Sequence, residues 1–151
     1  MHSSRWSTLL QYASHEAQAL QPPSQWTTLS YFSLAWSAFQ QRQCAQSLQA
    51  LQGYAAHGGS ASRPEVLLIQ GRCALEHGDS ARGVAAFQKI ITTQPPEHPM
   101  ALEARLGLAE ALQQQREWAR AAKLLAEVRA ADPALENRVR LQLGSLYVAQ
   151  G

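Results

Sequence analysis

Residues 71–95 read GRCALEHGDSARGVAAFQKIITTQP. Counted from Gly71, this stretch places Gly78, Gly83, Phe87 and Pro95 at offsets of 7, 12, 16 and 24 residues. Glycine tolerates the left-handed backbone conformation that ends a helix, and proline cannot continue a helix. The stretch therefore predicts two helices joined by a tight turn at Gly78, with the second helix ending before Pro95.

The same spacing recurs along the chain, and we call these four offsets the repeat spacing. The further copies are Ala35, Arg42, Ser47, Leu51 and Gly59, and then Ala109, Arg116, Ala121, Leu125 and Pro133. A last start at Gly144 reaches Tyr147 and Gly151 and supplies half a copy. The four starts are 36, 38 and 35 residues apart. Self-similarity at such a period predicts a stack of repeated helix pairs.

Each copy fits two antiparallel helices that pack closely. A small residue in the first helix, such as Gly71, lets the second helix approach, and Gly83 receives the first helix in return. Asp79 or Ser80 can cap the second helix after the turn. The chain is rich in alanine, leucine and glutamine, which also favours helices over strands. We therefore expect an all-α fold.

The repeat spacing resembles that of the tetratricopeptide repeat. The segment LGSLYVAQG, residues 143–151, is similar to the first-helix signature of that family. Residues 71–95 carry most of the family pattern, and residues 106–133 carry its alanines and an aspartate-proline ending. The resemblance implies a right-handed α-α superhelix of antiparallel helix pairs, a tetratricopeptide-like solenoid. The expected array covers residues 28–151, divided into a degenerate copy at 28–61, copies at 64–97 and 102–135, and a half repeat at 137–151.

The amino-terminal segment, residues 1–22, stands apart from the repeats. Its apolar residues fall on one face of a helix that closes at Pro22 and Pro23. These residues are Trp6, Leu9, Leu10, Ala13, Ala17 and Leu20. We expect an amino-terminal capping helix that covers the first repeat. A helix that binds a partner is the alternative.

Several functional classes are excluded by composition and motifs. Thirteen basic and eleven acidic residues give a net charge of +2 without the basic stripe that nucleic acid binding requires. No stretch approaches the ~20 apolar residues of a membrane span, and no signal peptide is visible. Cys44 and Cys73 form no zinc pattern and are assigned no chemistry. No catalytic motif is present. We expect a cytoplasmic protein that is not an enzyme and has no cofactor or metal.

The resemblance implies that the first helix of each pair lines a concave surface that binds partners. Matching positions predict a partner-binding groove at Leu29, Phe32, Trp36, Phe39, Leu68, Arg72, Leu75, Leu106, Glu110 and Leu141. Because most of these side chains are apolar, the groove suits an apolar or amphipathic segment of a protein partner. Phe32, Trp36 and Phe39 could instead pack against the amino-terminal helix.

Two functions fit this pattern. The first is a non-enzymatic interaction module, such as a chaperone or an assembly adaptor of a bacterial secretion or cell-envelope system. The second is a scaffold that self-associates through the half repeat, or a piece of a longer repeat protein. In that second case Leu143, Leu146 and Tyr147 would form an open face, which makes a homo-oligomer possible.

Overall fold

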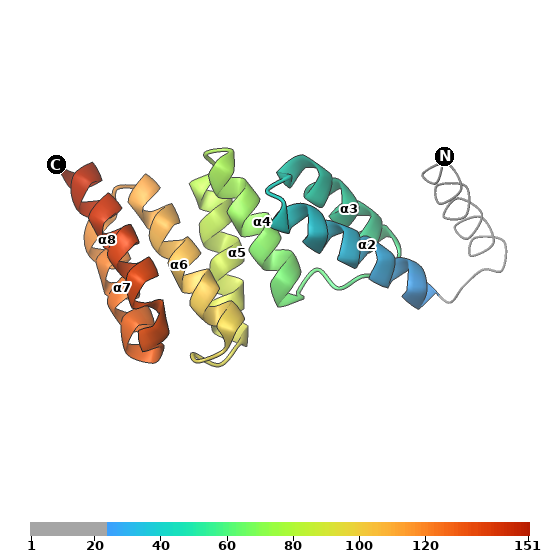
Figure 1. Ribbon diagram of the computed structural model, residues 1–151. Helices are drawn as coiled ribbons and strands as arrows, with labels where there is room; N and C mark the ends of the chain where they lie inside the picture. Colours follow the sequence, from blue (N-terminus) through green and yellow to red (C-terminus); the bar gives the residue numbers. More distant parts are fainter. Residues whose placement is uncertain (1–23) are drawn as a thin grey trace, which may run out of the picture. The chain divides into compact units, whose positions relative to one another are not determined.

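The computed structural model describes residues 24–151, and every element in this range is helical. The chain divides into two compact units, residues 1–60 and 61–151. The first unit contains α2 (Ser24–Gln40) and α3 (Cys44–Ala56). The second unit contains α4 (Pro64–Glu76), α5 (Ser80–Thr93), α6 (Pro99–Gln114), α7 (Trp118–Ala131), the short 3-10 helix η1 (Pro133–Leu135) and α8 (Glu136–Gln150) (Figure 1). The predicted all-α fold of helix pairs is confirmed.

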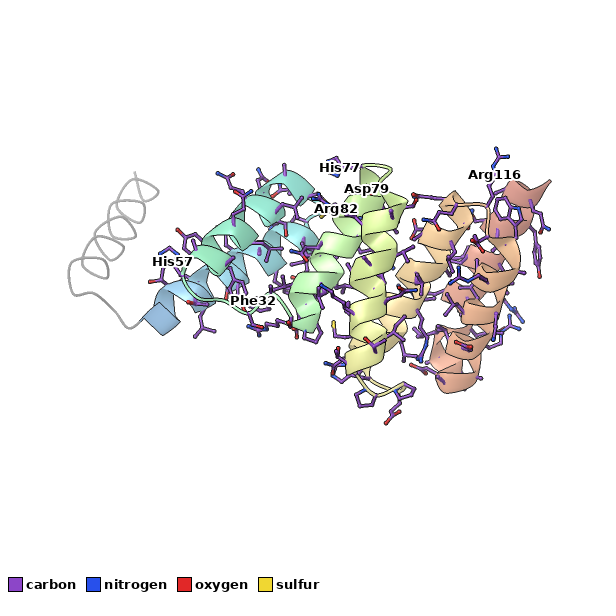
Figure 2. The ribbon with its side chains drawn as sticks, turned by 180° about the vertical axis from the view of Figure 1, so that it is seen from behind. Phe32, His57, His77, Asp79, Arg82 and Arg116 are labelled. Carbon is purple, nitrogen blue, oxygen red and sulfur yellow. The ribbon has the colours of Figure 1, made fainter. Side chains whose placement is uncertain are left out.

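The turn inside each helix pair lies where the repeat spacing predicts it. Arg42, Gly78 and Arg116, each seven residues after its start, have positive φ angles of 59°, 75° and 61°. The amide of the next residue donates to a carbonyl five residues earlier, at 2.9 Å after Arg42 and Gly78 and 2.8 Å after Arg116. This is the left-handed helix ending that glycine favours. Figure 2 shows the turn residues Asp79 and Arg116 at the same end of the second unit.

The positive φ angle of Arg116 leads to a stability prediction. We expect Arg116→Gly to raise the free energy of unfolding by about 0.5–1 kcal/mol, because glycine adopts this conformation without a steric cost. Urea denaturation followed by circular dichroism measures the change. Gly78→Ala is the matched control and should lower stability by a similar amount through its φ of 75° alone, since a Cβ atom there meets nothing within 4 Å. An unchanged or less stable Arg116→Gly protein would contradict this explanation.

The small residues of the repeat spacing mark the places where paired helices approach. In the first unit Ser47 is fully buried, and its Oγ donates to the carbonyl of Ala35 at 2.7 Å. In the second unit a Cβ atom on Gly83 would lie 3.5 Å from the carbonyl oxygen of Gly71. The degenerate copy therefore keeps the close approach, with a hydroxyl group in place of glycine.

The large residue of each copy lies in a core. Leu51, Phe87 and Leu125 are all buried, and Phe87 is among the largest side chains with no exposed surface. A Cβ atom on Gly71 would lie 2.7 Å from Cε1 of the Phe87 ring, and one on Gly107 would overlap the same ring. Phe87 of α5 therefore fits between a glycine of α4 and a glycine of α6. The second of these glycines is two residues before the position that the spacing predicted.

The helix ends also follow the sequence. Helices α5 and α7 end two residues before Pro95 and Pro133, respectively. Asp79 caps α5, because its carboxylate accepts from the amide of Arg82 at 3.2 Å. These ends confirm the helix boundaries that the proline and aspartate positions predicted.

The cysteines are buried in separate helices. Cys44 begins α3 in the first unit, and Cys73 lies inside α4 in the second. The sequence assigned them no chemistry. That assignment was wrong, because neither described cysteine is a free thiol.

Candidate partner-binding surface

Three helices of the second unit carry a row of polar side chains. Helix α6 contacts both α4 and α8, so that the first helices of successive pairs are neighbours (Figure 1). The row bridges these helices, and we call it the polar ladder. Its members are Arg72, Glu103, Glu110, Gln113, Gln114, Arg138, Gln142 and Ser145.

Ion pairs form the charged part of the ladder. Arg72 Nη1 of α4 lies 2.6 Å from Glu110 Oε2 of α6, and its Nη2 lies 4.0 Å from Glu103 Oε2. Glu103 accepts two hydrogen bonds from Arg138 of α8, one of them at 3.0 Å. The four charges therefore form one chain across three helices. Because they act as a network and are partly buried, they stabilise the neighbouring helices more than isolated surface pairs do.

Amide side chains extend the ladder by bonding to the next helix. Gln114 donates to the carbonyl of Leu75 at 3.4 Å, and Gln142 donates to the carbonyl of Leu106 at 3.1 Å. Gln113 donates to Ser145 Oγ at 3.3 Å. Gln142 was not among the groove residues that the sequence predicted. Its position four residues after Arg138, on the same helix face, is the signal that could have identified it.

The ladder lowers the pKa of Glu103 below its ordinary value of 4.5. The hydrogen bonds from Arg138 are the main cause, burial opposes them, and the charges of Arg138 and Arg72 add to the lowering. The same contact raises the pKa of Arg138 and keeps it charged. A carboxyl group whose pKa is lowered by folding stabilises the folded state at pH values above its ordinary pKa. This contribution is lost as the pH falls through the folded-state pKa.

A pH-dependence prediction follows for Glu103. We expect Glu103→Gln to be less stable than the natural chain at pH 7, because it removes the charge that pairs with Arg138. The difference should shrink as the pH falls below about 4.5, where Glu103 takes up its proton in the unfolded chain, and should vanish once the pH is below its lower folded-state pKa. Urea denaturation from pH 7 to about pH 3 measures it. Glu97→Gln, at an exposed loop position, is the control. A stability difference that stays constant with pH would contradict the prediction.

The structure corrects part of the predicted groove. Leu68, Leu75 and Leu106 are buried, so their side chains are not available to a partner. For Leu75 the reason is its packing on α5, where a Cβ atom on Gly83 would lie 2.9 Å from Leu75 Cδ2. Arg72 and Glu110 do lie on the surface that the first helices share, within the polar ladder. On α4 and α6 the groove residues that reach this surface are polar, whereas the sequence predicted an apolar groove.

Comparison with protein families gives two matches, both described as tetratricopeptide repeat, at residues 32–99 and 103–134. The chain belongs to the tetratricopeptide-repeat family. The first match covers residues 32–61 of the degenerate copy predicted at 28–61. Searches of the curated proteins and of the solved structures gave no match.

Membership in the tetratricopeptide-repeat family indicates a protein-protein interaction module. Stacked repeats of this kind expose extended surfaces that bind other proteins. Across residues 24–151, no group of three or more histidine, cysteine, aspartate or glutamate side chains is placed to hold a metal ion. No helix in this described range is long and apolar enough to cross a membrane.

The predicted groove residues of the first unit lie along α2 of the first tetratricopeptide pair. Leu29 is exposed, whereas Phe32, Trp36 and Phe39 are half-buried. The Phe32 ring lies 5.9 Å from that of Tyr54, and the Trp36 ring lies 5.6 Å from that of Phe39. Figure 2 labels Phe32 in this unit. The expected capping helix at residues 1–22 lies outside the described residues, so its packing on these rings stays a prediction.

Helix α8, where the sequence predicted a half repeat, presents apolar side chains to solvent. Leu141, Tyr147 and Val148 are 76%, 61% and 83% exposed, respectively. Leu143 is half-buried. Leu146 is only 1% exposed, so the prediction that it belongs to an open face was wrong.

The helical period explains the two sides of α8. Val139 and Leu146 are buried and lie seven residues apart on one side of the helix. Leu141 and Val148 are also seven residues apart, but two positions further along the helix. Two positions correspond to a rotation of about 200°, which places these two residues on the opposite side.

Proposed function

We propose that this chain is a non-enzymatic interaction module that binds an amphipathic segment of a partner protein, as a chaperone or an assembly adaptor. The observation that carries this proposal is the exposed apolar surface formed by Leu141, Tyr147 and Val148 on α8. Clustered exposed apolar side chains commonly mark interaction sites. The ladder residues Arg138 and Ser145 lie on the same helix, so a bound segment can place its apolar side on α8 and its polar side toward the ladder.

Panning a phage-displayed peptide library against the full chain tests this function. We expect enrichment of amphipathic sequences whose binding is lost in the double variant Leu141→Glu, Val148→Glu. Both positions are exposed, so the change alters the surface without placing a charge in the core. Ala126→Glu, at an exposed position of α7, is the control and should bind normally. No enrichment above background, or equal enrichment by the double variant, would refute the proposal.

A self-associating scaffold is the second candidate, and the same exposed face of α8 supports it. In this case Leu141 and Tyr147 would be buried between two copies of the chain. The molar mass in solution across a dilution series, measured by light scattering, should then exceed 16.6 kDa. Leu141→Glu with Tyr147→Glu should restore the monomer. A monomer at all concentrations would rule out this candidate and leave the partner-binding function.

A further inference from the structure

Helix α8 repeats a three-residue motif of α4. In α4 the motif is Leu68, Gly71 and Leu75, and in α8 a leucine, a glycine and a second aliphatic residue lie at the same spacing 73 positions later. The α8 residues are Leu141, Gly144 and Val148. Both sets lie on one helix face, because their spacings of three and four residues match the helical period.

The motif of α4 is covered by α5. The Phe87 ring lies against Gly71, where an added Cβ atom would approach its Cε1 atom to 2.7 Å. Gly83 lies against Leu75, where an added Cβ atom would approach Cδ2 to 2.9 Å. Two residues of α5 therefore cover the α4 motif at Gly71 and Leu75.

The motif of α8 has no such cover in the described chain. Leu141 and Val148 are more than three-quarters exposed, and a Cβ atom on Gly144 would meet nothing within 4 Å. The other helical glycines of residues 24–151 all face a side chain. They are Gly53, Gly71, Gly83 and Gly107. Gly144 thus occupies the motif position of Gly71, but no side chain of the described residues packs against it.

The buried side of α5 shows which residues of a helix can pack against such a motif. Its buried residues Gly83, Phe87 and Ile90 follow the order small, large, aliphatic, at spacings of four and three residues. Helix α7 repeats this order 38 residues later with buried residues of matching size, which are Ala121, Leu125 and Val128. The second helices of two pairs, α5 and α7, therefore share the small, large, aliphatic pattern on their buried sides.

We propose that the face of Leu141, Gly144 and Val148 binds a helix of a partner protein that carries this small, large, aliphatic pattern. The large residue packs over Gly144, as Phe87 packs over Gly71. The bound helix runs antiparallel to α8, as expected for the hairpin that α4 and α5 form around their short turn. The inference rests on the proposed function and specifies the partner segment.

The α5 sequence itself is a suitable probe. A fluorescein-labelled peptide of residues 79–94 contains the whole pattern, and a staple on its exposed side maintains the helix that a short peptide would otherwise lose. Fluorescence anisotropy with the full chain should show saturable binding. We expect a Phe87→Ala peptide to bind at least about tenfold more weakly, because it lacks the ring that packs over Gly144.

Variants of the full chain locate the binding site. Gly144→Val fills the space that the large residue would occupy and should weaken binding by about tenfold or more. Ala126→Val, at an exposed position of α7, should bind normally, and circular dichroism verifies that both variants fold. Equal binding by Gly144→Val would overturn the proposal, since the peptide would then occupy another surface such as that of α4.

Further outcomes separate this inference from the proposed function. If the α5 peptide does not bind, but library peptides of another pattern bind and require Leu141 and Val148, this inference fails and the proposed function stands. If neither kind of peptide binds, both fail. If light scattering shows a dimer that Gly144→Val dissociates, the occupant is a second copy of the chain, and the proposed partner helix is wrong.

Discussion

Replacing Phe87 with alanine should lower the free energy of unfolding by about 3–5 kcal/mol. The ring has no exposed surface and fits between Gly71 and Gly107, which have no side chains that could move into the space it leaves. The Arg72 guanidinium also lies 5.9 Å from the ring centroid, so the change removes a cation-π contact that supports the polar ladder. Urea denaturation followed by circular dichroism measures the loss.

A milder variant keeps this prediction testable if the alanine protein does not fold. Phe87→Leu retains most of the apolar volume and should cost less than the alanine change. Val148→Ala is the control, because that side chain is 83% exposed and its removal should change stability by less than about 0.5 kcal/mol. Equal stability of the Phe87→Ala and natural chains would show that the ring does not support the second unit.

Much of the fold was predictable because the residues of the repeat spacing act on the backbone conformation of their own segment. A left-handed residue at the turn and a proline after the second helix act locally, so their effects can be read without knowing the neighbours. The turn at Gly78 and the end of α5 before Pro95 follow from these local effects. The turn at Arg116 was found only through its spacing, since arginine is not a residue that favours positive φ.

The candidate surface was less predictable because burial depends on tertiary contacts. Leu75 and Arg72 are three residues apart on α4, and the resemblance assigned both to one groove. In the structure Leu75 packs on α5, whereas Arg72 reaches Glu110 of α6. The direction of a side chain differs by about 60° between such positions, which is enough to separate core from surface. Likewise, the helical period separates Leu146 from Leu141, but it does not say which side of α8 is buried.

Replacing Gly107 with alanine should lower the free energy of unfolding by about 1–3 kcal/mol, although alanine is the better helix former. The added Cβ atom would overlap the Phe87 ring, and that ring cannot move away because Gly71 contacts it from α4. Gly144→Ala is the matched control on α8. Its Cβ atom meets nothing within 4 Å, so we expect a gain of about 0.5–1 kcal/mol from helix propensity alone.

A double variant tests whether the loss at Gly107 comes from the ring. In a Phe87→Ala background the overlap is absent, so adding Gly107→Ala should cost little or even stabilise the protein. The two changes together should therefore cost less than the sum of their separate costs. Additive costs would mean that the alanine at position 107 meets an obstacle other than Phe87. A stable Gly107→Ala single variant would contradict the packing of one ring between two glycines.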